Sequence, residues 1–109
     1  MNIYVDIDDT ICHYPQGNAA LDYAQAQPIP SRISYINQLH DEGATITYWT
    51  ARGTVSGIDW TQITKKQLES WGAKHHHLIL GKPNYDIFID DKAFNSDAYF
   101  SERLQHAEV

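Results

Sequence analysis

Five residues near the N-terminus, Asp6-Ile7-Asp8-Asp9-Thr10, place carboxylates and a hydroxyl directly after the apolar stretch Ile3-Tyr4-Val5. Side chains two apart on a strand point to the same side, so Asp6 and Asp8 can face one substrate. One carboxylate could attack phosphorus and form an aspartyl-phosphate, and the other could protonate the leaving oxygen and later activate water. A plain acidic turn and a calcium loop are the alternatives, but the Gly and Glu positions of an EF-hand hold other residues here.

Three further signals follow in a fixed order, each just beyond an apolar run: Thr50, Lys82 and the pair Asp90-Asp91. The Thr50 hydroxyl could hold a phosphoryl oxygen, and Lys82 could neutralise the attacking carboxylate and the phosphate together. Two acids at a buried strand end would repel each other unless a cation joins them. Oxygen ligands and a phosphate substrate suit Mg²⁺. The series therefore predicts a metal-assisted phosphoryl-transfer enzyme.

Other reactive residues give weaker signals. Arg52 could bind the phosphate or another anionic group of a substrate, or it could be a surface arginine in a loop. The run His75-His76-His77 invites a transition-metal interpretation, but adjacent histidines entering a strand point different ways, so we expect a solvent-facing strand entry. A nucleophilic pair of Cys12 and His13 is disfavoured because neighbours in sequence rarely meet in the required geometry.

Apolar periodicity predicts four strands that alternate with helices. We expect strands at about 2–7, 45–50, 77–80 and 86–90, helices at about 31–42, 59–71 and 96–105, and a loop or flap at 11–30. Ser31, Asp59 and Ser96 are candidate N-caps. This alternation is typical of an α/β fold with a parallel sheet, whose sites form beyond the carboxyl ends of the strands. The acidic cluster and the three later signals should therefore meet in one crevice.

The composition limits the class of protein. The 109 residues, 42% hydrophobic and 20% charged, suit a single globular domain spanning residues 1–109. The net charge of −6 and the lack of a basic patch favour a small substrate over a polynucleotide. One cysteine and no long apolar stretch predict a cytoplasmic protein without a signal peptide or membrane helix.

Taken together, the four signals resemble the four-motif signature of the haloacid dehalogenase superfamily of phosphohydrolases. The resemblance covers nearly the whole chain. The segments Thr50-Ala51-Arg52-Gly53, Gly81-Lys82-Pro83 and Ile89-Asp90-Asp91-Lys92-Ala93 are also similar to a smaller group of short, capless proteins described as capsule or polysaccharide biosynthesis phosphatases.

The resemblance implies a role for each matching residue. Asp6 would be the nucleophile and a Mg²⁺ ligand, and Asp8 would be the general acid and base, with its backbone carbonyl on the metal. Asp90 would be the third protein ligand, with Asp91 in support, and Thr10 would orient the loop and Asp8.

The phosphoryl group and the rest of the substrate would be held by residues that follow the second and third strands. These are Thr50, Ala51, Arg52 and Lys82.

The fold implied by the resemblance is a small Rossmann-like sheet with strand order 4-1-2-3. Residues 11–30 and 51–75 are too short for the cap domain that many members insert. The flap, a neighbouring subunit or a large substrate must then screen the site from water, so a homo-oligomer is a reasonable expectation.

We therefore expect a Mg²⁺-dependent phosphomonoesterase acting on a small phosphorylated metabolite, namely a sugar phosphate of polysaccharide or nucleotide-sugar biosynthesis. A nucleotidase or a nucleic-acid end phosphatase is the second enzyme hypothesis. The third is a phosphoryl-receiving or binding domain. In receivers, however, the acid pair comes early in the chain and a single phospho-accepting Asp lies in the middle.

Overall fold

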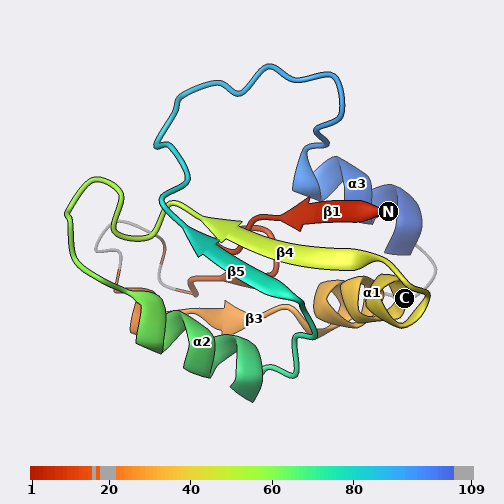
Figure 1. The fold of residues 1–109 in the computed structure, drawn as a ribbon, viewed down its shortest axis with the longest axis horizontal. Coiled ribbons are helices and arrows are strands. Elements are labelled where there is room, and N and C mark those ends of the chain that lie inside the picture. Colours follow the sequence, from red (N-terminus) through yellow and green to blue (C-terminus); the bar gives the residue numbers. More distant parts are fainter. Residues whose placement is uncertain (16, 18–21, 105–109) are drawn as a thin grey trace.

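A parallel three-stranded sheet forms the centre of the computed structural model, which describes residues 1–15, 17 and 22–104 (Figure 1). Its strands are β1 (Asn2–Val5), β4 (Thr45–Thr50) and β5 (His77–Leu80), in the order β1-β4-β5. β1 pairs with β4 from Asn2 opposite Thr45, and β4 pairs with β5 from Thr47 opposite His77. The parallel α/β class and the order of the first three predicted strands are thus confirmed.

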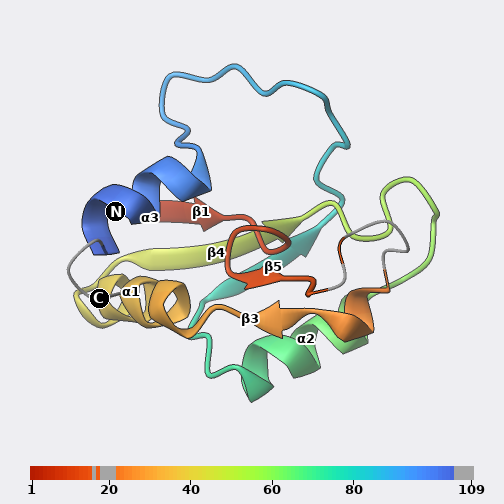
Figure 2. The same cartoon turned by 180° about the vertical axis from the view of Figure 1, so that it is seen from behind.

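Three helices complete the fold: α1 (Pro30–Asp41), α2 (Thr61–Ser70) and α3 (Ser96–Leu104). In the two opposite views, α1 and α2 lie below the sheet, and α3 lies beside β1 (Figures 1 and 2). Helices α1 and α2 each connect two parallel strands, as the short crossovers of such sheets require.

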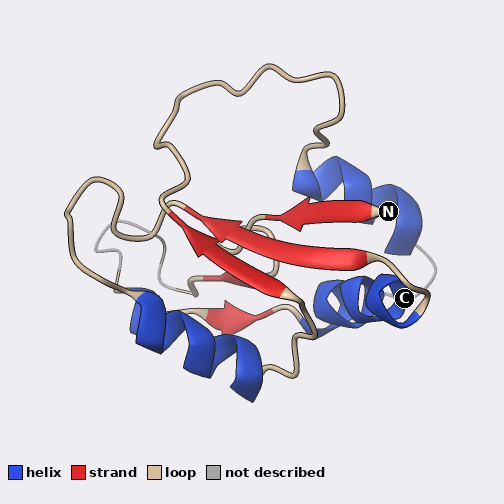
Figure 3. Cartoon of the chain, in the orientation of Figure 1, coloured by secondary structure: helices blue, strands red, loops and turns tan. Residues whose placement is uncertain are grey.

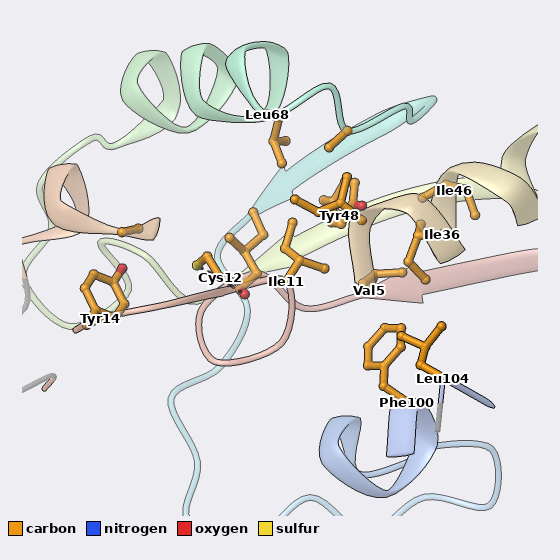
Figure 4. Close-up of a cluster of buried hydrophobic side chains, with 14 residues drawn as sticks. Val5, Ile11, Cys12, Tyr14, Ile36, Ile46, Tyr48, Leu68, Phe100 and Leu104 are labelled. Atoms are coloured by element: carbon orange, nitrogen blue, oxygen red, sulfur yellow. Dashed lines mark hydrogen bonds between the residues drawn. The ribbon is translucent and has the colours of Figure 1, made fainter. Parts of the chain in front are cut away.

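The core lies between the sheet and these helices. Val5, Ile46 and Tyr48 are buried and lie on one face of the sheet, and Thr47 between the last two is also buried. Leu68 of α2 points toward the sheet, and Phe100 of α3 points toward Val5 (Figure 4). One face of the sheet therefore carries the apolar contacts, and the acidic loop that follows β1 joins this core through Ile7 and Ile11.

All three expected helix caps are corrected. Helix α1 begins at Pro30 after the N-cap Ile29, which makes no side-chain capping bond, so Ser31 lies inside the helix. The fixed φ of Pro30 favours the first helical position, and this outweighs the capping preference of serine. Helix α2 begins at Thr61, and its N-cap is Trp60. Asp59 lies one residue before this N-cap, and its carboxylate accepts the Thr61 N–H. Helix α3 begins with Ser96 itself, and Asn95 accepts the N–H of Ala98.

The flap contains more structure than the sequence suggests. Two-residue strands β2 (Cys12–His13) and β3 (Gln27–Pro28) pair antiparallel, and a 3-10 turn, η1, covers Tyr23–Gln25. Strands of two residues are too short to produce an apolar period. Part of the flap expected at 11–30 lies outside the described residues.

The fourth strand, expected at 86–90, is not formed. The segment from Gly81 to Asn95 has no regular structure and arches away from the sheet (Figure 3). Ile87, Phe88 and Ile89 are 77%, 47% and 93% exposed. An apolar run predicts burial, but a strand also needs a paired neighbour, and in the described part of the chain β1 remains an edge strand. The predicted order 4-1-2-3 is therefore present only as 1-2-3.

The described residues form no cap domain, as expected. None of their helices is long and apolar enough to cross a membrane.

Candidate active site

A tight turn after β1 presents the two leading carboxylates. The carbonyl of Ile7 accepts hydrogen bonds from the N–H groups of Thr10 and Ile11, at 3.1 and 3.0 Å. Asp9 takes φ of +62°, in the left-handed region that residues other than glycine seldom adopt. Ser96, the first residue of α3, donates to the Asp9 carbonyl at 3.3 Å and holds this turn. The turn separates the surroundings of Asp6 from those of Asp8.

Asp6 lies between a hydroxyl donor and a cation. The Thr10 hydroxyl donates to its Oδ2 at 3.1 Å, and Lys82 Nζ lies 3.3 Å from its Oδ1. The Asp6 side chain is 34% exposed, and that of Lys82 is 13% exposed. The expected meeting of Asp6 with Lys82 thus occurs, and one face of the carboxylate remains open to solvent.

The protonation of Asp6 follows from this partial burial. Removal from water raises the pKa of Asp6 above its ordinary value of 3.8, and the positive charge of Lys82 and the Thr10 hydrogen bond lower it by less. Since a carboxylate attacks only when ionised, reactivity at this atom should rise with pH through a pKa above that of a free aspartate.

Lys82 reaches Asp6 because its backbone continues the pairing of β5 with β4. Its N–H donates to the Thr50 carbonyl at 3.1 Å, just past the last paired residues. Its ammonium lies 5.5 Å from the ring centre of Trp49 and 5.4 Å from that of Tyr85, within the range of a cation–π contact. The strand ends therefore place Asp6, Thr50 and Lys82 at the same end of the sheet, where the carboxyl ends of its strands lie.

Thr50 is 1% exposed, and its hydroxyl oxygen accepts the backbone N–H of Arg52 at 3.1 Å. This bond uses the oxygen as an acceptor, so the hydroxyl hydrogen does not take part in it. Ala51 is half-buried, and its carbonyl accepts the Thr54 N–H at 3.0 Å in the following turn.

Asp8 is held by a buried arginine. Arg52 Nη2 lies 2.9 Å from Oδ1 of Asp8, and Arg52 Nε lies 3.1 Å from Oδ2. The Arg52 side chain is fully buried and the Asp8 side chain is 21% exposed. Such a two-point pair between guanidinium and carboxylate is both strong and directional.

Two more donors meet the same carboxylate. The Tyr14 hydroxyl donates to Asp8 Oδ1 at 2.5 Å, and the Cys12 thiol lies 3.6 Å from the same oxygen. Burial, with the charge of Asp8, raises the pKa of Cys12 to about 12. The thiol is therefore neutral near pH 7, which argues against a nucleophilic pair of Cys12 and His13.

Two expected roles need correction. Arg52 is neither a surface residue nor a ligand open to a substrate anion, because its donors bind Asp8, Thr64 and Gln67. Thr10 donates to Asp6 and not to Asp8. Sequence spacing could not show either result, because both depend on the direction of side chains around the turn.

Asp90 and Asp91 do not join the other acids. Both are exposed, and Asp90 Oδ2 accepts the Lys92 N–H at 3.4 Å within its own loop. No group of three or more His, Cys, Asp or Glu side chains that could hold a metal ion occurs among the described residues. The set of side chains expected for Mg²⁺ is thus incomplete in this arrangement, since Asp90 belonged to the fourth strand that is not formed.

The histidine run occupies a different part of the surface. His76 Nδ1 accepts the Ile46 N–H at 3.1 Å, and the His76 ring stacks on that of His40 with centres 4.6 Å apart. His77 is exposed at the start of β5, as expected for a strand entry. A groove of about 810 Å³ passes these histidines, and another of about 530 Å³ lies between α1 and the end of α2, so neither includes Asp6.

The sequence did not reveal the partners of Arg52. Asp8 and Arg52 are 44 residues apart, and Thr64 and Gln67 are ordinary polar residues of a helix. Tyr14 of the flap donates to the same acid. The one available signal was an arginine two residues after the strand-end Thr50.

Comparison with known proteins supports the fold. No protein-family model matches the sequence, and no curated protein matches it. A crystal structure of a structural-genomics target from Vibrio cholerae aligns with 99% of this chain and 98% of its own, with a TM-score of 0.77 and 24% identity. At that identity the match establishes a shared fold over the whole chain. It carries no information on activity, which must be argued from the site.

Proposed function

We propose that this protein is a phosphomonoester hydrolase that works through an aspartyl-phosphate on Asp6. The observation that carries the proposal is the contact of Lys82 with Asp6, 3.3 Å between Nζ and Oδ1, at the edge of the sheet where Thr50 ends β4. A nucleophile, a cation and a hydroxyl at one edge are what phosphoryl transfer requires, because its catalysis is mostly positioning and charge stabilisation.

The first step would form a bond between an Asp6 oxygen and phosphorus and break the bond from phosphorus to the ester oxygen. The leaving alkoxide would take a proton from the protonated form of Asp8. Lys82, and the hydroxyl of Thr50, would stabilise the charge on the transferring phosphoryl group. In the second step Asp8 would take a proton from water, whose oxygen attacks phosphorus, so that phosphate leaves and the Asp6 carboxylate is restored.

The substrate class we propose is a small phosphorylated metabolite, with a sugar phosphate of polysaccharide or nucleotide-sugar biosynthesis as the leading case. The net charge of −6 and the eight Lys and Arg residues offer little attraction to a polynucleotide. The described residues form no cap, so a small ester can reach Asp6 directly. A nucleotidase remains the second candidate, because exposed Tyr4 and half-buried Trp49 could stack on a base.

We also propose Mg²⁺ as the cofactor and a haloacid dehalogenase-like core as the finer description of the fold. The described acids do not complete a metal site, so no step above passes through the ion. In the finer fold, residues 86–90 would add to the edge strand β1 as a fourth strand. The exposed Ile87 and Ile89 favour this pairing because docking would remove their apolar surface from water.

The experiment that tests the proposed function measures phosphate release from sugar phosphates, nucleotides and small phosphoesters, with Mg²⁺ and with EDTA. Asp6→Asn is the matched variant, since it removes the nucleophile and keeps the shape. We expect metal-dependent release by the wild type and a loss of at least about 10³-fold in the variant. Equal release by both proteins would refute the role of Asp6.

A further inference from the structure

Arg52 is the largest fully buried side chain among the described residues. A buried guanidinium is tolerated only when its charge is paired and its N–H groups are satisfied. Here it meets both conditions: Asp8 supplies the opposite charge, and Thr64 Oγ1 and Gln67 Oε1 accept from Nη1 at 3.1 and 2.6 Å. The buried Arg52 side chain is therefore held in one position, with its guanidinium against the Asp8 carboxylate.

The partners of Arg52 come from separate elements. Asp8 lies in the turn after β1, and Thr64 and Gln67 belong to α2. The guanidinium also lies 4.8 Å from the ring centre of Tyr23 in η1, and Gln67 donates to the Tyr23 carbonyl at 2.7 Å. Arg52 thus links the acidic turn to α2 and to the flap.

Asp8 is left with little freedom. Its Oδ1 receives Arg52, Tyr14 and the Cys12 thiol, whereas Arg52 is the only described residue that donates to its Oδ2. A carboxylate offers about four lone-pair sites, so Oδ2 keeps one lone pair for a proton from substrate or water. A lysine could not reproduce this, because its ammonium is a point charge without the planar fork.

We propose that Arg52 is a positioning residue that fixes Asp8 for proton transfer, with Oδ2 as the atom that exchanges the proton. The proposal rests on the proposed phosphatase function. Arg52 does not touch the substrate; it acts by orienting Asp8, and Tyr14 assists by donating to Oδ1. Proton transfer, and not phosphate binding, is the step that depends on Arg52.

The test compares Arg52→Lys and Asp8→Asn with the wild type on an alkyl phosphate and an aryl phosphate. The alkyl leaving group needs a proton in the first step, and the aryl group leaves without one. We expect Arg52→Lys to lower kcat/KM by about 10²-fold on the alkyl ester, as loss of acid–base help does, and far less on the aryl ester. With the aryl ester, Arg52→Lys should release a burst of phenol in the first turnover. The burst arises because hydrolysis of the phosphoenzyme, the second step, also needs Asp8.

Arg32→Lys is the matched control. Arg32 pairs with Asp97 at 3.0 Å and donates to the Thr10 carbonyl at 3.1 Å, so the same substitution there disturbs an arginine ion pair that does not touch Asp8. Any effect of Arg32→Lys should be equal on the two esters. An equal loss on both esters in Arg52→Lys, or a further loss when it is added to Asp8→Asn, would overturn the proposal.

Two further measurements keep the test decisive. If Arg52→Lys does not fold, Tyr14→Phe removes one donor to Asp8 and should give the same pattern to a smaller degree, whereas equal losses on the two esters would count against the proposal. If the wild type hydrolyses neither ester, the proposed function fails. A double-mutant cycle of thermal unfolding, with Asp8→Asn, Arg52→Lys and the double variant, then tests the pairing of Arg52 with Asp8 by itself. Additive shifts in Tm would then refute the coupling of Arg52 to Asp8.

Discussion

Asp6 and Asp8 are two residues apart, yet they have different partners and therefore different chemistry. Asp6 has Thr10 and Lys82 and an open face, whereas Asp8 is bound on both oxygens by Arg52. The first arrangement suits a nucleophile that must reach phosphorus. The second suits a group that must hold one orientation while protons move.

Replacing Lys82 by methionine should affect both rate and pH dependence. The loss of one charge-stabilising donor should lower kcat/KM by about 10²–10³-fold. Because Lys82 lowers the pKa of Asp6 against the effect of burial, its removal should also move the acid limb of the rate profile to higher pH. Lys74→Met is the control, since Lys74 pairs with Asp41 on the surface at 2.9 Å. An unmoved acid limb would contradict the assignment.

Replacing Asp6 by asparagine should raise Tm at neutral pH. The folded pKa of Asp6 lies above its ordinary value of 3.8, so the folded protein binds this proton more tightly than the unfolded chain. Stability is therefore lost as pH rises from below 3.8 through the raised pKa, and Asp6→Asn avoids that loss. The gain in Tm over wild type should vanish at pH values below 3.8, the ordinary pKa of Asp6.

Asp41→Asn gives the opposite sign and serves as a control. The hydrogen bond from Lys74 lowers the pKa of Asp41, so its carboxylate contributes stability above the ordinary pKa that is lost as pH falls. At neutral pH this variant should melt slightly below wild type. A lower Tm for Asp6→Asn as well would mean that burial does not dominate at Asp6.

At the scale of elements, the loop from Ala51 to Gly57 depends on one close approach. A Cβ on Gly53 would lie 2.2 Å from the Ile58 carbonyl oxygen, and one on Gly57 would meet nothing within 4 Å. Both residues have positive φ, +82° and +76°, so alanine is strained by about 1–2 kcal/mol at either position.

Gly53→Ala should consequently lower Tm more than Gly57→Ala does. It should also lower kcat/KM, because the loop begins directly after Thr50 and contains Arg52. Thermal unfolding of the two variants side by side separates the clash from the shared backbone strain. Equal losses of Tm would show that the loop moves freely away from Ile58.

The segment 86–90 supplies a second prediction at this scale. If it adds to β1 when Mg²⁺ binds, its backbone amides should become protected from hydrogen exchange on addition of the ion. Asp90→Asn should remove that protection, whereas Asp86→Asn, at the start of the segment, should keep it. Exchange that Mg²⁺ does not change would limit the sheet to its three strands.

At the scale of the whole molecule, the sequence predicted what depends on pattern. The alternation of apolar runs predicted the three paired strands, and their carboxyl ends predicted that Lys82 would meet Asp6. It could not predict that Arg52 turns inward to Asp8, because apolar periodicity does not show the direction of a loop side chain. The run Ile87-Phe88-Ile89 has the composition of a strand, but composition does not show whether a pairing partner is reached.

The net charge also belongs to this scale. At −6, the chain should repel dianionic esters at a distance, so the local cation Lys82 must provide the attraction. The open face of Asp6 beside this one cation is consistent with a small ester and with the absence of a cap from the described residues.

The measurement that tests the central claim most directly is acid quench of the reaction within the first turnovers, followed by peptide mapping of the phosphorylated residue. The account predicts a phosphoryl group on Asp6, in larger amount in Asp8→Asn, where hydrolysis of the intermediate is slowed. Turnover without a covalent intermediate, or a phosphoryl group on any other residue, would contradict it.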